Sequence, residues 1–259
     1  SAFCNAGFDV FGRNNSFESY VGNIGINLTA AMMIILGGLG FSVIDDVWRK
    51  RAWKSLETHS KLVLSMTAFL LILGTIGIYF LEMINSSAMA HLSSGERWVA
   101  SFFQSTSTRT AGIATVNISE LKAPTLLLML ILMFIGASPG STGGGIKTTT
   151  FGVVLASVWT LIRGKEDIEL FYRRVSLDMI YRSFAIVMVA LSLIFIMTGV
   201  LMIVEDKDFL FLLFEVTSAF GTVGLSASVT PTLSPIGKLI IIITMFAGRV
   251  GTLTVLLSL

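Results

Sequence analysis

Residues 97–114 read RWVASFFQSTSTRTAGIA, an apolar segment followed by a polar turn around Gly112. The apolar part, residues 97–107, is too short to cross a bilayer, which takes about 20 apolar residues. Longer apolar stretches lie on both sides of it, at residues 62–84 and from residue 121 onward. A short apolar helix that enters the membrane between two spans and returns through a polar loop is the plan of a pore-loop unit. The sequence therefore predicts a re-entrant half-helix at residues 97–107.

The same order of segments is repeated later in the chain. Residues 209–219, FLFLLFEVTSA, form a second short apolar segment that ends in a Gly-containing turn. Stretches long enough to span flank it at residues 182–204 and 233–259, and another candidate span covers residues 22–47. We therefore expect an all-α integral membrane protein built from repeated span, pore-loop, span units.

The composition agrees with a membrane protein. Of 259 residues, 54% are hydrophobic and 13% are charged, whereas soluble domains carry about 25% charged residues. The single Cys4 excludes an intramolecular disulfide and a cysteine-built metal site. The net charge of +2 gives no sign of nucleic-acid binding. The expected surroundings of the chain are therefore the lipid bilayer.

The positions of the basic residues predict the orientation. Ten of the 18 lysines and arginines fall in two linkers, which the positive-inside rule assigns to the cytoplasm. They are Arg49, Lys50, Arg51, Lys54 and Lys61 in the first linker and Arg163, Lys165, Arg173, Arg174 and Arg182 in the second. The half-helices are then expected to enter from the outside. Because the chain opens on Ser1 in the middle of a repeated motif, we also expect it to be a piece of a longer polypeptide.

Three short strings align on one glycine each: CNAGFD at residues 4–9, RTAGIA at residues 109–114 and GTVGLS at residues 221–226. The aligned glycines are 105 and 112 residues apart, and the tripeptide SAF at residues 1–3 recurs at residues 218–220. Backbone carbonyls in such loops can replace the hydration shell of an ion, and the half-helix before each loop points its partially negative end at a cation. The strings are therefore predicted to be cation filters, with simple glycine turns as the alternative.

The string GASPGSTGGGIKTTT, residues 136–150, interrupts the long apolar stretch of residues 121–162. Five glycines and a proline cannot continue a helix, so we expect a broken helix whose second arm covers residues 151–162. The string also resembles a phosphate-binding loop, but such a loop needs a preceding strand and an aqueous nucleotide, so this alternative is rejected. Irregular backbone at membrane depth is tolerated where it is buried in protein or lines a cavity. The loop is therefore expected to be either a gate below the filters or a packing element.

Arg249 lies inside an apolar helix, where an unpartnered charge costs at least about 2.5 to 3.5 kcal/mol. We expect its guanidinium to bind carbonyls of the Gly-rich string, and the alternative is that it snorkels to the cytoplasmic interface. Glu215 and Arg109 are two further charges at depth. Either they pair with each other and brace the filters, or each is satisfied by its own surroundings.

These strings resemble the Ktr/Trk/HKT superfamily of potassium transporters, and most closely its bacterial Ktr-type membrane subunit. NAGFD, TAGIATVN, GTVGLS and GASPGSTGGGIK carry the resemblance, which covers essentially the whole chain. Subunits of this superfamily fuse four span, pore-loop, span units around a pseudo-fourfold pore. The resemblance implies that the first unit is absent and that residues 1–60 hold the filter, second span and cytoplasmic linker of unit two. Residues 61–175 would then form unit three with its broken second span, and residues 176–259 unit four.

The resemblance also implies site residues, ions and partners. Potassium would bind at a filter lined by Asn5, Ala6, Gly7, Thr110, Ala111, Gly112, Thr222, Val223 and Gly224. A gate would comprise Gly136, Ser138, Gly140, Gly143, Gly144, Gly145, Lys147 and Arg249. Sodium would act as an activator, and a nucleotide would act only through a cytosolic regulatory ring. The membrane subunit would be a homodimer in the bacterial plasma membrane.

Two rival functions remain at this point. An alternating-access, sodium-coupled carrier also uses broken helices and internal repeats, but it would place ligand residues on discontinuous spans. An intramembrane hydrolase would need a nucleophile and a base at membrane depth, and Ser138 and Ser141 have no evident base. No catalytic residue is therefore predicted, and the preferred function is potassium uptake through a channel-like pathway.

Overall fold

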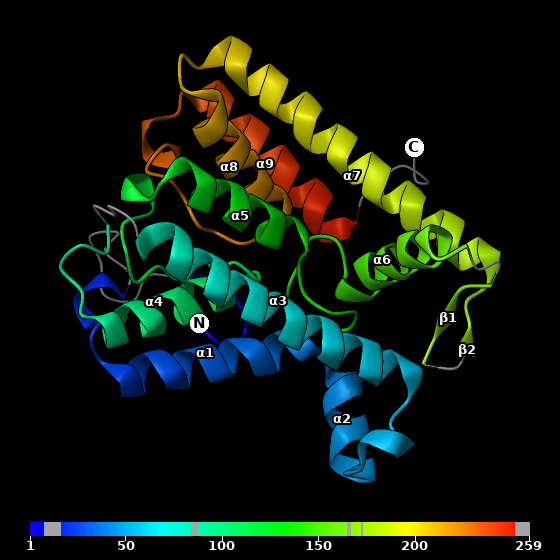
Figure 1. Ribbon diagram of the computed structural model, residues 1–259. Coiled ribbons are helices and arrows are strands. Elements are labelled where there is room, and N and C mark those ends of the chain that lie inside the picture. Colours follow the sequence, from blue (N-terminus) through cyan, green and yellow to red (C-terminus); the bar gives the residue numbers. More distant parts are fainter. Residues whose placement is uncertain (8–16, 84–87, 165–166, 172, 252–259) are drawn as a thin grey trace.

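The computed structural model describes residues 1–7, 17–83, 88–164, 167–171 and 173–251, and within them it is predominantly helical (Figure 1). The α-helices are α1 (Ile24–Leu39), α2 (Phe41–Lys50), α3 (Thr58–Met83), α4 (Ser94–Ser107), α5 (Ala123–Phe134), α6 (Thr148–Ile162), α7 (Leu177–Val204), α8 (Phe209–Phe220) and α9 (Pro235–Val250). Short 3-10 turns are η1 (Glu18–Tyr20), η2 (Trp53–Ser55), η3 (Ile118–Glu120) and η4 (Thr230–Thr232). Two strands, β1 (Glu169–Leu170) and β2 (Arg173–Arg174), pair antiparallel in a small hairpin that the sequence did not predict.

Helices α3 and α7 are long and apolar enough to cross a membrane, and the bent pair of α1 and α2 can count as a third span. The prediction of one continuous span over residues 22–47 is wrong. The chain breaks at Gly40 and α2 leaves α1 at 97°. Gly40 adopts φ +89, and a Cβ there would lie 2.5 Å from the carbonyl oxygen of Pro139. Close packing of the loop after α5 therefore requires a glycine at the break.

The two predicted half-helices are present with nearly the predicted bounds. Helix α4 begins with a capping box in which Ser93 and Glu96 each bind the other's backbone N–H, and it packs against α1 and α3. Helix α8 packs against α5, α7 and α9. The last five residues of α4 and the last seven of α8 are buried. Both half-helices therefore deliver their carboxyl ends, and the loops that follow, to the interior of the molecule.

The broken helix is also present. Helices α5 and α6 flank an irregular segment that contains Pro139 and the glycines, and α6 starts three residues before the predicted arm at residue 151. The backbone around the break folds on itself, because Ile135 and Ile146 form a parallel bridge and the Ile146 N–H donates to the Phe134 carbonyl. This bridge brings the ends of the two arms together around the loop.

Buried carboxylates fix the starts of α5 and α9. Glu82, at the end of α3, accepts from the Lys122 N–H at 3.1 Å and from the Thr125 hydroxyl at 2.5 Å. Glu205, directly after α7, accepts from the Ser234 N–H at 2.8 Å. These contacts satisfy N–H groups at the starts of α5 and α9 and favour the helix dipoles. A carboxylate at the end of α3 and one directly after α7 thus make the same kind of contact with the start of α5 and of α9.

Some predictions fall on residues outside the described ranges. They are the last two residues of the string CNAGFD, Lys165 of the second basic linker, the end of the span predicted at residues 62–84, and residues 252–259 of the last predicted span.

Candidate functional site

Three loops at residues 5–7, 110–112 and 222–224, called here the filter loops, converge although they are more than a hundred residues apart in sequence. A Cβ built on Gly7 would lie 3.0 Å from the carbonyl oxygen of Ala111 and 3.7 Å from that of Val223. A Cβ on Gly112 would lie well inside 3.0 Å of the Val223 carbonyl oxygen. One on Gly224 would lie 3.6 Å from the Gly112 Cα. The structure therefore brings together the three aligned glycines and the carbonyls beside them.

The filter loops share one unusual backbone conformation. The first residue of each has positive φ, +49 at Asn5, +77 at Thr110 and +51 at Thr222. The glycine two residues later is also positive, at +64, +70 and +94 along the chain. The left-handed region is tolerated by asparagine and is a genuine outlier for a β-branched threonine. Strain of this kind costs about 1 to 3 kcal/mol per residue and is concentrated at functional sites.

The middle residues of the loops differ in their exposure. Ala111 and Val223 are fully buried, and Ala6 is exposed.

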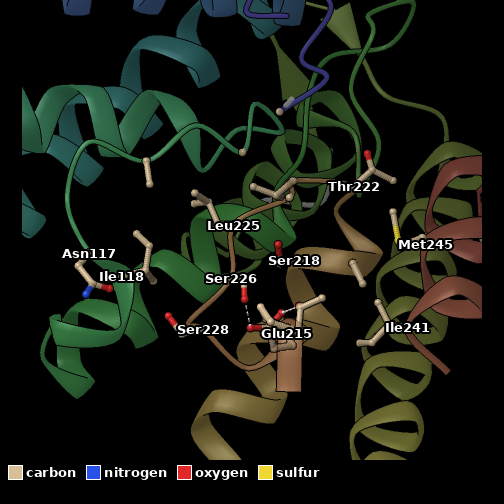
Figure 2. A pocket seen from close by; sticks show the side chains of 18 of the residues that line it. Asn117, Ile118, Glu215, Ser218, Thr222, Leu225, Ser226, Ser228, Ile241 and Met245 are labelled. Carbon is tan, nitrogen blue, oxygen red and sulfur yellow. Dashed lines mark hydrogen bonds between the residues drawn. The ribbon is translucent and has the colours of Figure 1, made fainter. Parts of the chain in front are cut away.

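A cavity of about 490 Å³ opens on Gly7, Gly112 and Gly224. It is also lined by two carboxylic acids, Glu18 and Glu215, and Figure 2 shows Glu215 among the lining residues. Burial is the larger cause that raises the pKa of Glu18, and the neighbouring Glu120 carboxylate raises this pKa further. The cavity therefore combines backbone carbonyls with acidic side chains, a composition that suits a cation.

Glu215 holds the segment that follows the last filter loop. Its carboxylate accepts from the Ser226 hydroxyl at 2.5 Å (Figure 2). It also accepts from the Ala227 N–H at 3.0 Å and from the Thr230 hydroxyl at 2.5 Å. The described residues contain no ion pair between Glu215 and Arg109, so the pairing alternative is wrong and local satisfaction is correct for Glu215. Arg109 is buried, and its Nε has no hydrogen-bond partner among the described residues.

Glu215→Gln is expected to weaken ion selectivity while the protein still folds. A carboxylate can accept all three hydrogen bonds, whereas an amide has one acceptor oxygen and presents an NH2 group to donors. Losing part of this brace leaves the loop after Gly224 less fixed, and a buried hydrogen bond to a charged group contributes about 1.5 to 3 kcal/mol. We expect the ratio of rubidium to sodium uptake to fall about tenfold. Uptake of both ions into proteoliposomes measures this ratio, and an unchanged ratio would contradict the role given to Glu215.

The Gly-rich loop, residues 136–147, lies directly against two filter loops. The Gly144 N–H donates to the Thr222 hydroxyl at 3.0 Å. Cβ atoms on Gly143 and Gly144 would collide with the side chains of Thr110 and Thr222, respectively. The loop can reach the first residues of these filter loops only because it carries glycine at both positions.

The same loop is anchored to α1 through backbone groups. The Ser138 N–H donates to the Gly38 carbonyl at 3.1 Å, and the Thr142 N–H and hydroxyl both approach the Gly37 carbonyl at 3.4 and 3.3 Å. Ser138 is fully buried and its hydroxyl accepts from that of Thr148 at 3.0 Å. The sequence did not predict Gly37 as a partner, because the acceptor is a backbone carbonyl, which every type of residue possesses. Residues 136–138, 143 and 144 of the loop are buried, whereas its tip at residues 139–142 is half-buried or exposed. The irregular backbone is therefore held by hydrogen bonds to protein groups on α1.

The remaining glycines of the loop shape its turns. Gly140 and Gly145 adopt φ +70 and +69, and the Gly140 carbonyl accepts from the Phe41 N–H at 3.3 Å. A Cβ on Gly136 would strike the Gly144 carbonyl. All the predicted gate glycines thus lie in one folded loop beside the filter loops.

Two basic side chains bind this loop. Arg249 Nη1 donates to the Thr142 carbonyl at 2.5 Å, and Lys147 Nζ donates to the Gly143 carbonyl at 2.7 Å. The contact predicted between Arg249 and the loop carbonyls is therefore present. The two cations are close enough to repel each other. The two side chains bind the carbonyls of consecutive residues, Thr142 and Gly143, and so place two positive charges beside the loop.

Comparison with known proteins identifies the family to which the chain belongs. The family model described as TrkH, cation transport protein, matches residues 1–259. The chain is 42% identical over 256 residues to Ktr system potassium uptake protein B of Vibrio alginolyticus, covering 98% of this chain and 56% of that protein. It is 39% identical over 263 residues to the potassium/sodium uptake protein NtpJ of Enterococcus hirae, covering 100% of this chain and 58% of that protein. The chain thus spans little more than half the length of these relatives.

A solved structure has the same fold. The potassium transporter TrkH from Vibrio parahaemolyticus superposes with a TM-score of 0.81 at 18% sequence identity, over 100% of this chain and 56% of that one. At this identity the likeness concerns the fold alone.

Proposed function

The chain belongs to the TrkH family of cation transport proteins, and we propose that it forms part of a pathway for potassium uptake across the bacterial plasma membrane. The family is one of transporters, not of enzymes. Potassium crosses through a carbonyl filter to which residues 5–7, 110–112 and 222–224 contribute. The convergence of three loops with the same strained backbone is the observation that carries this proposal.

The physical reason for such loops is ion dehydration. An ion that leaves water for a protein pore loses hydration oxygens, and inward-facing carbonyls of several loops replace them. Helices α4 and α8 end at two of the filter loops, and their carboxyl ends carry a partial negative charge that favours a cation. The acidic cavity lining at Glu18 and Glu215 supports the same sign of charge.

The Gly-rich loop is proposed as the gate on the cytoplasmic side of the filter. Its hydrogen bond to Thr222 and its contact with Thr110 support a position directly next to the filter loops. Arg249 and Lys147 hold the loop in place and add a positive barrier to cation flow. A change in the position of this loop would therefore open or close the pathway.

The assembly around this chain belongs to the same proposal. Units arranged around a pseudo-fourfold pore, a homodimer, sodium as activator and a cytosolic nucleotide-binding ring follow from the resemblance to Ktr systems. Two of its relatives are a Ktr system potassium uptake protein and a potassium/sodium uptake protein. The division into residues 1–60, 61–175 and 176–259 corresponds to units two, three and four in this scheme.

Replacing Gly224 with aspartate tests the filter. We expect the complete parent protein in liposomes to take up rubidium in preference to sodium, and Gly224→Asp to abolish rubidium uptake. At φ +94 any side chain strains the backbone, and a Cβ there would lie 3.6 Å from the Gly112 Cα, so the aspartate carboxylate would stand among the filter loops. Uptake unaffected by the substitution would mean that the loops are structural turns, and an alternating-access, sodium-coupled carrier would become the better reading.

A further inference from the structure

Helix α2 leaves the end of α1 at a right angle and projects away from the rest of the molecule (Figure 1). Helix α1 has 16 residues and so rises about 24 Å, less than the roughly 30 Å of the hydrocarbon core. Its end at Gly40 therefore lies close to the edge of the hydrocarbon when α1 crosses the membrane. A bend of 97° at that depth directs α2 along the membrane surface. The basic residues of the linker identify this surface as the cytoplasmic one.

The orientation of α2 about its own axis is fixed by contacts on one side. Val43 is fully buried, and the Asp46 carboxylate accepts from the Glu57 N–H at 3.0 Å next to the start of α3. The opposite side carries Phe41 and Trp48, two turns apart, which are 79% and 74% exposed. The helix is therefore amphipathic and directs an aromatic face away from the protein.

Cations without carboxylate partners accompany this face. Arg49 and Lys50 are paired with carboxylates of the same linker. For Arg51 and Lys54, the described part of the chain provides no ion pair. The Arg51 guanidinium instead lies 5.9 Å from the centre of the Trp48 ring. An arginine stacked on an exposed indole keeps its donors available for a bidentate oxyanion.

The same pairing recurs at the end of α6. The Arg163 guanidinium lies 4.7 Å from the centre of the Trp159 ring, and Trp159 is 57% exposed. Arg163 too has no carboxylate partner within the ranges that the structure describes. The two linkers meet through Trp53 and Phe171, whose ring centres are 6.5 Å apart. Two tryptophan–arginine pairs thus occupy the same end of the molecule.

We infer that Phe41, Trp48, Arg51, Lys54, Trp159 and Arg163, the interfacial belt, dock on anionic lipid headgroups of the cytoplasmic leaflet. Indole rings favour the depth of the headgroups, and arginines bind phosphate in a bidentate manner. The belt continues the apolar face of α1, on which Met32 and Leu36 are exposed. Its unpaired positive charge complements the negative surface potential of that leaflet, which attracts each basic side chain by about 1 kcal/mol. The belt therefore binds phosphatidylglycerol in preference to phosphatidylcholine.

Quenching of tryptophan fluorescence by brominated lipids tests this inference. The complete parent protein is reconstituted in phosphatidylcholine bilayers that contain increasing amounts of brominated phosphatidylglycerol or brominated phosphatidylcholine. A Trp48→Phe, Trp159→Phe variant gives the signal of the other tryptophans, which is subtracted. The charge variant is Arg51→Gln with Arg163→Gln. Its matched control is Arg174→Gln with Arg182→Gln, because these arginines lie at the same end and are paired with Asp167 and Asp178.

We expect the preference of the wild type for phosphatidylglycerol to fall about 25-fold in the charge variant, about fivefold for each arginine, and to persist in the control. An unchanged preference in the charge variant would overturn the inference, and so would an equal fall in both variants, since that would reflect bulk charge alone. If the preference is unchanged while binding of a cytosolic partner is lost, the belt is a protein interface and the inference is wrong. The readout does not depend on ion transport, so its outcome is separate from that of the proposed function.

Discussion

Gly112→Ala is expected to abolish rubidium uptake, with a loss of at least about 100-fold, or about 2.7 kcal/mol of barrier. Two separate effects add at this position. The backbone adopts φ +70, a conformation that L side chains rarely adopt, and the new methyl group would collide with the Val223 carbonyl oxygen. Either the carbonyl is displaced from its loop or the turn at residues 110–112 changes its shape. Both results remove carbonyl oxygens from the position at which an ion would lose its water.

Gly164→Ala is the matched control. Gly164 has φ +65 with no atom within 4 Å of a built Cβ, so alanine there carries the same backbone strain without the collision. We expect its rubidium uptake to stay within about twofold of the wild type. Uptake is normalised to folded protein by size-exclusion chromatography and thermal stability, because Gly112→Ala can also reduce folding yield. Full uptake in folded Gly112→Ala protein would contradict a filter at this glycine.

Local signals in the sequence predicted most of the membrane architecture. The half-helix predicted at residues 209–219 differs from α8 by one residue at its end, because a short apolar run bounded by polar turns has few other solutions in a bilayer. The break between α5 and α6 was predicted for a similar reason, since proline and clustered glycines exclude a helix. Features of this kind are encoded within a few neighbouring residues.

Features that depend on distant backbone atoms could not be predicted. Residues 22–47 are continuously apolar up to the charged end, and the bend at Gly40 follows from the Pro139 carbonyl packed against it. The anchoring of the Gly-rich loop on Gly37 and Gly38 uses carbonyls that every residue possesses. Glu215 illustrates the same limit, because its charge predicted a partner but its three donors are neutral groups of its own unit.

The strained conformation of the filter loops was also invisible in the sequence. Threonine is disfavoured at positive φ, so the strings RTAGIA and GTVGLS predicted a turn at their glycines and not at Thr110 or Thr222. The surroundings impose this conformation, since the Thr222 hydroxyl accepts from the Gly144 N–H of the Gly-rich loop. Filter and loop therefore constrain one another, which links the state of the proposed gate to the geometry of the filter.

Arg249→Gln is expected to raise rubidium uptake about tenfold, or about 1.4 kcal/mol, when the proposed cytosolic regulatory partner is absent. The guanidinium donates to the Thr142 carbonyl, next to the Gly143 carbonyl that Lys147 holds. Its removal deletes one of the two cationic contacts on the Gly-rich loop and one positive charge beside the pathway. A charged hydrogen bond of this kind is worth about 1.5 to 3 kcal/mol. The closed position of the loop should therefore be less favoured, and the barrier to a cation lower.

Arg249→Lys separates these two effects, and Arg182→Gln controls for loss of charge at the same end of the molecule. Lysine keeps the positive charge, but its compact ammonium group lacks the planar guanidinium that reaches the Thr142 carbonyl. It therefore preserves the electrostatic barrier to a cation and loses the hydrogen bond to the loop. If the hydrogen bond from Arg249 to the Thr142 carbonyl holds the loop closed, Arg249→Lys should resemble Arg249→Gln. If the positive charge is what slows the cation, Arg249→Lys should resemble the wild type. Uptake in proteoliposomes of the complete parent protein, with and without the partner, distinguishes the two. Equal uptake and equal activation in wild type and Arg249→Gln would show that the Gly-rich loop is a packing element, because a gate cannot lose this contact without a change in its open fraction.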